Sequence, residues 1–289
     1  MKAAFTNTYS VKPTEYSLSV SKTLKGDTPR ENDAFTFELK ENEAYDGVIM
    51  PSNTDVAVRA GETGSFATIM FTKPGTFMFT VSEQNDKKSG YTYDDTVYTV
   101  KVIVEDIDSE LTVTSVTMNG KDYKDTALEF VNTYFTGGLT VSKTVTGSGD
   151  KYKEFTFTVK LSDKSINGIY GDMEFVNGVA TFMLKHGESK TATELPVGVT
   201  YTVVESNNEG YEVSSTGDTG TISKAKIAKV AFTNHMDTVP DKPSENEEAS
   251  PSPSTGDEAH LALYITLLIL SGSGIILLIP MRKRFKKER

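Results

Sequence analysis

Cysteine and tryptophan are absent from this chain of 289 residues, and histidine occurs only 3 times. Without cysteine the chain can form neither disulfides nor thiolate–metal sites. The histidines, His186, His235 and His260, are too scattered for a zinc site. We therefore expect no metal and no cofactor. If the protein works outside the cell, its stability must come from a source other than disulfides.

Basic clusters are also scarce. The formal net charge is −10, and residues 282–289 carry six Lys/Arg against one Glu, so the rest of the chain is more acidic still. Binding to nucleic acid needs clustered Lys and Arg that neutralise phosphates. The charge distribution therefore argues against nucleic acid as a partner.

The residues that the chain does contain favour strands. Thr and Val are abundant, and there are 13 Tyr and 15 Phe, all types that are enriched in β-structure. A chain of this length is enough for about two domains, each with a core of its own. The composition therefore predicts an all-β protein.

The C-terminal segment has the pattern of a membrane span. Residues 261–281 are almost wholly apolar, and the basic residues 282–289 follow at once. A transmembrane helix needs roughly 20 apolar residues, and flanking positive charge keeps its end in the cytoplasm. One interpretation is an ordinary single-pass anchor. The residues that precede the span point to another: Ser252, Pro253, Ser254, Thr255 and Gly256.

This order of pentapeptide, apolar span and basic tail over residues 252–289 resembles the LPXTG-type cell-wall sorting signal. The resemblance implies that sortase, a membrane transpeptidase, cleaves between Thr255 and Gly256. Sortase would then pass the Thr255 carbonyl to an amine of peptidoglycan or of a pilin. The membrane would hold the chain only before sorting, and the mature protein would belong to the extracellular cell wall. Ser252 stands where the pattern usually has Leu.

The segment before the sorting signal, residues 238–251, is acidic and rich in Pro, Ser and Glu. Such a composition offers nothing to bury. We expect a disordered, extended tether that holds the folded part clear of the membrane and keeps the cleavage site accessible.

An internal repeat organises the chain upstream of the tether. Four blocks recur in the same order, each with alternating apolar and polar residues between turn-forming residues. They predict two tandem antiparallel β-sandwich domains, residues 14–136 and 137–237. The matching blocks are 17–26 with 138–147, 34–39 with 154–159, 79–83 with 201–205, and 128–132 with 230–234.

Strand alternation turns six polar residues toward the predicted cores, because successive side chains point to opposite faces. Each domain contributes one Lys, one Glu and one Asn. Buried charges must pair, neutralise or react. One interpretation is a buried Lys–Glu pair completed by Asn; another is a desolvated Lys amine that attacks the Asn carboxamide and releases ammonia, with Glu shuttling protons. The residues are Lys22, Glu83 and Asn132, and Lys143, Glu205 and Asn234.

These blocks resemble the intramolecular isopeptide domains of Gram-positive pilins and the B-type modules of collagen adhesins. The resemblance covers about residues 14–237 and implies immunoglobulin-like sandwiches. It also implies that Lys22 joins Asn132 and that Lys143 joins Asn234. The corresponding glutamates would be catalytic for these bonds. Each bond would link the first and last strands of its domain.

The N-terminal residues 1–13 repeat the closing-strand pattern of the predicted domains and show no signal-peptide pattern. We expect them to be the remnant closing strand of a missing upstream domain plus a linker. Asn7 would be the orphaned cross-link acceptor of that domain.

Three function classes remain open. The first is a pilin-like structural stalk, anchored to the cell wall and not itself an enzyme. The second is an adhesin that binds a host matrix or glycan ligand through the 40–75 insertion. The third is the stalk of a larger surface enzyme whose catalytic part is missing.

The acidic stretch 106–110 lacks the spacing of a calcium loop, so we expect a solvated turn there.

Overall fold

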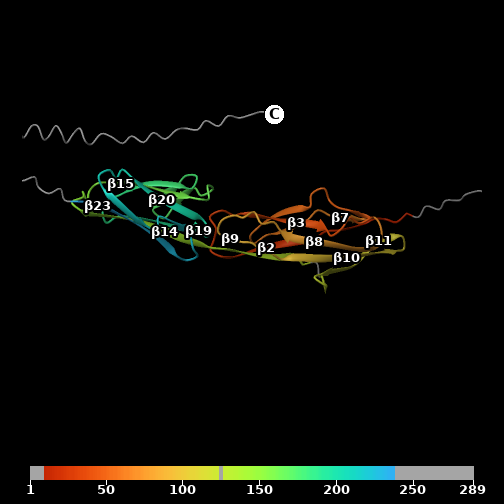
Figure 1. Ribbon diagram of the computed structural model, residues 1–289. Helices are drawn as coiled ribbons and strands as arrows, with labels where there is room; N and C mark the ends of the chain where they lie inside the picture. The colour runs from red at the N-terminus through yellow and green to blue at the C-terminus, as the bar shows by residue number, and fades with distance from the viewer. Residues whose placement is uncertain (1–9, 124–125, 238–289) are drawn as a thin grey trace, which may run out of the picture. The chain divides into compact units, whose positions relative to one another are not determined.

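The computed structural model describes residues 10–123 and 126–237. These residues form strands, turns and loops, with no α-helix among them, so the all-β prediction is confirmed (Figure 1). The described part accordingly contains no helix of the length and hydropathy that a membrane crossing requires. Asn7, the predicted tether and the predicted sorting signal lie outside the described residues.

The strands between residues 14 and 134 make up what we call the first β-module. Its six-stranded sheet has the order β12-β11-β10-β8-β3-β5, its four-stranded sheet the order β6-β2-β13-β9, and its three-stranded sheet the order β1-β7-β4. The strands are β1 Thr14–Tyr16, β2 Ser19–Gly26, β3 Ala34–Glu41, β4 Val48–Ile49, β5 Asp55–Arg59, β6 Thr63–Ser65, β7 Ile69–Phe71, β8 Gly75–Glu83, β9 Tyr91–Thr92, β10 Val97–Ile107, β11 Glu110–Met118, β12 Lys121–Asp122 and β13 Leu128–Tyr134.

The strands between residues 136 and 236 make up the second β-module. Two four-stranded sheets have the orders β19-β14-β23-β21 and β18-β15-β20-β22, and β16 pairs with β17 in a small sheet. The strands are β14 Thr136–Gly147, β15 Phe155–Leu161, β16 Gly168–Tyr170, β17 Met173–Phe175, β18 Val179–Leu184, β19 Ser189–Pro196, β20 Thr200–Ser206, β21 Glu212–Thr216, β22 Thr219–Thr221 and β23 Ile227–Met236.

Each module has a hydrophobic core of its own, built by the alternation that the sequence shows. In β3 the buried residues are Phe35, Phe37 and Leu39, and the side chains between them are less buried. In β15 the equivalent residues Phe155 and Phe157 are fully buried in the second core. Because the period of two is a property of the extended backbone, each strand delivers one apolar face to its core.

The expectation of wholly antiparallel sandwiches needs correction at one pair of strands in each module. β13 pairs with β2 in parallel, and β23 pairs with β14 in parallel. A parallel pair needs a long connection, which a hairpin cannot supply. Here the two paired strands lie near opposite ends of the sequence of their module, so the rest of the module provides that connection.

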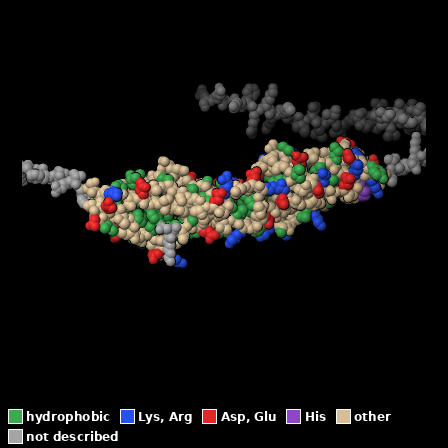
Figure 2. Space-filling model, turned by 180° about the vertical axis from the view of Figure 1, so that it is seen from behind, with side chains coloured by type: hydrophobic (Ala, Val, Ile, Leu, Met, Phe, Trp, Pro, Cys, Tyr) green, Lys and Arg blue, Asp and Glu red, His purple; other side chains and the backbone are tan. Residues whose placement is uncertain are grey.

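The 40–75 segment contributes β4, β5, β6 and β7 to the sheets of the first β-module. Its Tyr45 packs edge-on against Phe77, with ring centroids 5.4 Å apart, and its hydroxyl accepts a hydrogen bond from the Met78 backbone. Figure 2 shows Lys and Arg side chains interspersed with Asp and Glu on the face in view, with hydrophobic side chains scattered among them.

Candidate functional site

The first candidate site lies between the two large sheets of the first β-module. Lys22 is in β2 and Asn132 is in the neighbouring parallel strand β13. Lys22 is opposite Phe130, while Asn132 is opposite Leu24, so the two residues are offset by two positions and share a face. Glu83, the last residue of β8, enters from the facing sheet, where it pairs with Phe37.

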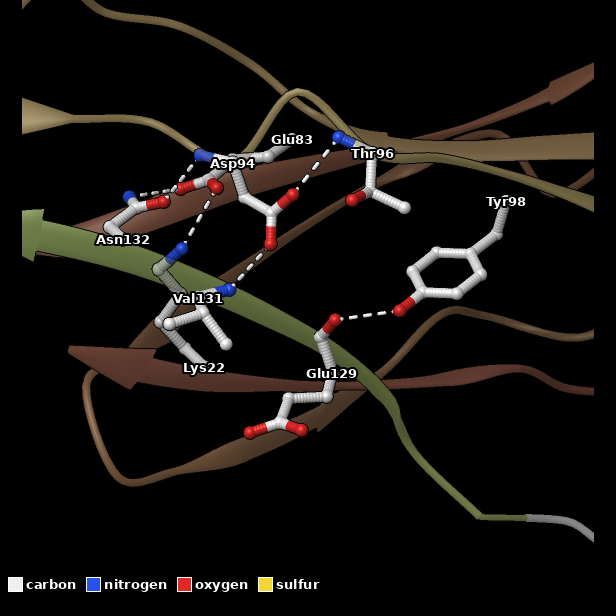
Figure 3. Close-up of polar contacts among 8 residues, drawn as sticks. All are labelled: Lys22, Glu83, Asp94, Thr96, Tyr98, Glu129, Val131 and Asn132. Atoms are coloured by element: carbon white, nitrogen blue, oxygen red, sulfur yellow. Dashed lines mark hydrogen bonds and ion pairs between the residues drawn. The ribbon is translucent and has the colours of Figure 1, made fainter. Parts of the chain in front are cut away.

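The three side chains are in direct contact. Lys22 Nζ lies 2.8 Å from Glu83 Oε2, and Asn132 Nδ2 donates a hydrogen bond of 2.7 Å to Glu83 Oε1 (Figure 3). The Lys22 and Glu83 side chains are 0% exposed. Lys22 Nζ also lies 4.8 Å from the centre of the Phe35 ring. The carboxylate therefore bridges the amine and the carboxamide inside an apolar enclosure.

Burial shifts both ionisable groups toward their neutral forms. Desolvation lowers the pKa of Lys22, against the opposing effect of its contact with Glu83. Desolvation likewise raises the pKa of Glu83, against the effects of Lys22 and Asn132. Both shifts favour transfer of a proton from the ammonium to the carboxylate, which would leave a nucleophilic amine beside a carboxylic acid.

Asp94 is a further member of this site, and strand alternation did not predict it, because it lies outside the strands. It lies in the loop between β9 and β10, and its N–H donates a hydrogen bond of 2.7 Å to Asn132 Oδ1. Its carboxylate accepts hydrogen bonds from the N–H groups of Thr96, at 3.0 Å, and Val131, at 2.7 Å. Burial alone would raise the pKa of Asp94, but the hydrogen bond from the Thr96 side chain, together with those from the Val131 and Thr96 N–H groups, outweighs it and lowers that pKa. The Asp-x-Thr sequence signals a turn but not a partner for Asn132.

The second candidate site repeats the arrangement in the second β-module. Lys143 in β14 is opposite Phe232, and Asn234 in β23 is opposite Val145, which is again an offset of two positions. Glu205 on β20 enters from the facing sheet. All three residues are buried, and burial lowers the pKa of Lys143, against the opposing effect of Glu205.

The contacts of the second site differ in detail from those of the first. Glu205 Oε1 lies 2.5 Å from Lys143 Nζ and also accepts the Asn234 Nδ2 hydrogen bond at 3.1 Å. Among the described residues, neither Glu205 Oε2 nor Asn234 Oδ1 has a hydrogen-bond partner. One carboxylate oxygen therefore serves both contacts here, whereas Glu83 uses two oxygens.

The inward orientation predicted for the six polar residues is confirmed, because each of their side chains is buried. The pattern also fits both interpretations of the sequence, a retained ion pair or a cross-link. An ion pair away from water carries a desolvation cost of several kcal/mol per ion, which a reaction that consumes both charges removes. The predicted sorting-signal residues 252–256 lie outside the described residues.

The acidic stretch 106–110 forms a turn between β10 and β11. Ser109 donates its N–H to Asp106 Oδ1 at 3.0 Å, and Asp108 and Ser109 have φ values of 55° and 71°. Glu110 pairs on the surface with Lys12 at 3.2 Å. Within residues 10–123 and 126–237, no group of three or more His, Cys, Asp or Glu side chains is placed to hold a metal ion.

Two family models match the chain, one on each β-module. Residues 18–135 match a family described as "Spy0128-like isopeptide containing domain". Residues 137–236 match a family described as "Domain of unknown function (DUF7601)".

Two known proteins are similar in sequence. The pilus tip adhesin Cpa of Streptococcus pyogenes is 41% identical over 116 residues, which cover 35% of this chain and 17% of the adhesin. A pilin of Streptococcus pyogenes serotype M1 is 31% identical over 159 residues, which cover 48% of this chain and 47% of the pilin. The chain therefore spans less than half the length of either relative.

Solved pilin structures share the fold. The major pilin protein (T-13) from Streptococcus pyogenes serotype GAS131465 has a TM-score of 0.53 at 22% identity, covering 80% of this chain and 100% of that chain. The major pilin protein (T3.2) from serotype GAS13637 has a TM-score of 0.52 at 23% identity, covering 80% and 99%. These relatives are structural proteins of the cell surface rather than enzymes. Residues 18–135 therefore match the Spy0128-like isopeptide-containing domains, and part of the chain is similar in sequence to a streptococcal pilin.

Proposed function

We propose that this chain is a structural, pilin-like stalk of the bacterial cell wall, in which each β-module closes an intramolecular Lys–Asn isopeptide bond. The observation that carries the proposal is the duplicated buried set of Lys, Glu and Asn. In both modules Lys and Asn lie on neighbouring parallel strands with the same two-position offset. A carboxylate from the facing sheet contacts both of them in each module.

The reaction starts with proton transfer from the Lys22 ammonium to the Glu83 carboxylate. The neutral amine then attacks Asn132 Cγ, which forms a new C–N bond and a tetrahedral intermediate. Glu83 relays a proton from the attacking nitrogen to Nδ2, the C–Nδ2 bond breaks, and ammonia leaves. An ammonium, a carboxylate and a carboxamide thus become an amide, a carboxylic acid and ammonia, so atoms and charge balance. Lys143, Glu205 and Asn234 take the same roles in the second β-module.

The position of the bonds suits a protein that bears tension. β2 and β13 are the neighbouring parallel strands near the beginning and end of the first β-module, and β14 and β23 hold the same places in the second. A covalent link between such strands carries a pulling force across the module without shearing the hydrogen bonds between the strands. In a chain without cysteine, this link has the role that a disulfide has elsewhere.

The proposal extends to the organisation of the whole chain. Residues 14–136 and 137–237 are the two isopeptide domains, residues 238–251 are a tether, and residues 252–289 are the sorting signal. Sortase joins the Thr255 carbonyl to an amine of peptidoglycan or of another pilin. The similarity of part of the chain to streptococcal pilins supports a pilus-associated role on the cell surface.

An adhesive role is the second candidate, since a segment of the chain is 41% identical to a pilus tip adhesin. The 40–75 segment was the expected place for a ligand site. Its aromatic residues, Tyr45, Phe66 and Phe71, are buried or half-buried against the rest of the module. This packing favours the stalk over an adhesin that uses exposed aromatic side chains of that segment.

Intact mass of the full-length chain under denaturing conditions tests the proposal. We expect a mass lower than the sequence predicts by two molecules of ammonia, with peptide mapping that assigns one loss to Lys22–Asn132 and one to Lys143–Asn234. The Glu83→Ala and Glu205→Ala variants each act as the other's control, because each should regain one ammonia in its own module. A parent chain at its full sequence mass would leave only buried ion pairs and sink the proposal.

A further inference from the structure

We propose that Asp94 supplies and positions an oxyanion donor for the Lys22–Asn132 bond: its backbone N–H binds Asn132 Oδ1, and its carboxylate holds that N–H in place. The inference rests on the proposed cross-linking function and adds a residue to it. Both modules contain Lys, Glu and Asn, but no equivalent donor reaches Asn234 Oδ1 from the described residues.

The placement of Asp94 follows from the way in which the β9–β13 ladder ends. β9 pairs with β13 at Tyr134 and Thr133, and the ladder stops there. The next backbone donor available along β13, Val131 N–H, donates to the Asp94 carboxylate instead of to a carbonyl. A side-chain oxygen thus takes the place of a backbone acceptor. The Asp94 N–H is then free of the ladder and points at the Asn132 side chain (Figure 3).

Both oxygens of the Asp94 carboxylate are used to hold this loop. Oδ2 accepts the Val131 N–H at 2.7 Å, which ties the loop to the strand that carries Asn132. Oδ1 accepts the Thr96 N–H at 3.0 Å, which closes a turn of the kind that Asp often stabilises. Val131 directly precedes Asn132 in the chain. Its hydrogen bond to the Asp94 carboxylate therefore fixes the Asp94 backbone relative to the reacting carboxamide of Asn132.

The hydrogen bond is aimed at the atom on which charge develops. When the Lys22 amine attacks Cγ, the Asn132 carbonyl oxygen becomes an oxyanion. A donor that is already 2.7 Å away stabilises this charge without reorganisation. Removing one such donor from an oxyanion site typically slows a reaction by roughly 10²- to 10³-fold. An Asp94→Ala variant keeps the backbone N–H but loses the carboxylate that holds it in position. We therefore expect the rate of bond formation to fall by a smaller factor, roughly 10- to 100-fold.

The second β-module lacks this arrangement because its ladder does not stop. β21 pairs with β23 without interruption from Glu212 opposite His235 to Thr216 opposite Ala231. The residues of β21 beside Asn234 are thus part of the ladder, where backbone groups serve the neighbouring strand. The second module therefore provides an internal control within the same chain.

The test follows both bonds in one sample. The full-length chain is made by cell-free translation, quenched in acidic urea at intervals, digested, and analysed by mass spectrometry. We expect Asp94→Ala to slow Lys22–Asn132 formation by roughly 10- to 100-fold and to leave the Lys143–Asn234 rate unchanged. Asp95→Ala, which removes a neighbouring exposed carboxylate, should leave both rates at the parent values.

A spectroscopic readout separates positioning from a general effect on folding. In a Lys22→Met background the first module stays unreacted, and the Asn132 ¹³Cγ resonance reports the hydrogen bond to its oxygen. Asp94→Ala should move this resonance upfield. An unmoved resonance, or a parental Lys22–Asn132 rate in Asp94→Ala, overturns the inference.

Two further outcomes are a variant that does not fold and a parent that does not form the Lys22–Asn132 bond. If Asp94→Ala fails to fold, Asp94→Asn is used instead, because it keeps one acceptor oxygen and the size of the side chain. We expect a slowed Lys22–Asn132 bond in this variant, and a parental rate overturns the inference. If the parent itself never forms the bond, the proposed function fails, and the inference fails with it. If the proposed function is right but Asp94 has no such role, both bonds still form in the parent, and the Asp94 variants form the Lys22–Asn132 bond at the parental rate.

Discussion

Replacing Asn132 with alanine removes the carboxamide that Lys22 would attack while leaving Lys22 and Glu83 in place. The variant should therefore keep its amine and lose the cross-link of the first β-module. Asn132 is 0% exposed, and its side chain makes one hydrogen bond to Glu83 and one to Asp94. The substitution thus acts on stability in two ways, through the lost covalent link and through the lost hydrogen bonds.

The larger contribution is the covalent link. A bond from position 22 to position 132 closes a loop of about 110 residues, and the chain-entropy model gives about 4.7 kcal/mol for a loop of this size. Each buried group left without its partner adds about 1–3 kcal/mol. The sum is comparable with the whole stability of a typical domain, about 5–15 kcal/mol. At about 4 °C per kcal/mol for a domain of this size, the cross-link alone accounts for roughly 20 °C in Tm.

Differential scanning calorimetry of the full-length chain measures this effect. We expect the transition of the first β-module to move down by roughly 20 °C or more in Asn132→Ala, while that of the second stays in place. Lys22→Met is a matched variant, because it also lacks the cross-link but puts an apolar side chain in the buried position. The loss that the two variants share is the contribution of the covalent link.

Similar melting temperatures of the parent and the two variants would contradict this prediction. If mass spectrometry shows that the parent has lost ammonia at Lys22–Asn132, yet both variants melt within about 5 °C of it, the covalent link does not stabilise the module by restricting the unfolded chain. Asn234→Ala shows which calorimetric transition belongs to which β-module, since it should lower only the transition temperature of the second.

Three further predictions follow from particular contacts. Because Asn234 Oδ1 has no donor among the described residues, the Lys143–Asn234 bond should form more slowly than the bond of the first module in time-resolved peptide mapping, and equal rates would contradict this. Burial raises the pKa of Tyr134 to about 12 from 10.0, so its stabilising effect is complete below pH 10 and falls by about 2.3 kcal/mol by pH 12. Tyr134→Phe should make the loss of stability over that range less steep, and an unchanged profile of unfolding free energy against pH would count against this. Gly147 has a φ of 70°, and an added Cβ would clash with the Met236 carbonyl oxygen. Gly147→Ala should therefore destabilise the second β-module by about 1–3 kcal/mol and lower the temperature of its calorimetric transition. An unchanged transition would show that the turn can relax.

The inward orientation of the candidate site residues could be predicted from the sequence. Lys22, Glu83 and Asn132 each fall in step with the apolar residues of their strands, and all three side chains are buried. The same holds for the second set, which the repeat identified. Local alternation is enough for this prediction because the two-residue period belongs to the extended backbone itself.

The contacts of Asp94 could not be predicted in the same way. Asp94 lies in a loop, where no period assigns a side chain to a face. Its hydrogen bonds depend on where the β9–β13 ladder stops, and that point is set by packing between strands distant in the sequence. The turn residues at positions 94–96 predict a turn, but they do not say which neighbouring strand the turn contacts.

The all-β class, the repeat and the identity of the inward-facing Lys, Glu and Asn follow from local alternation and composition, so they could be predicted from the amino-acid sequence. The parallel direction of β2 and β13, the two-position offset of Lys22 and Asn132, and the contact of Glu83 with both became apparent only in the folded chain. Strand order, direction and register are set by packing among segments about a hundred residues apart, and a local pattern carries no information on that packing.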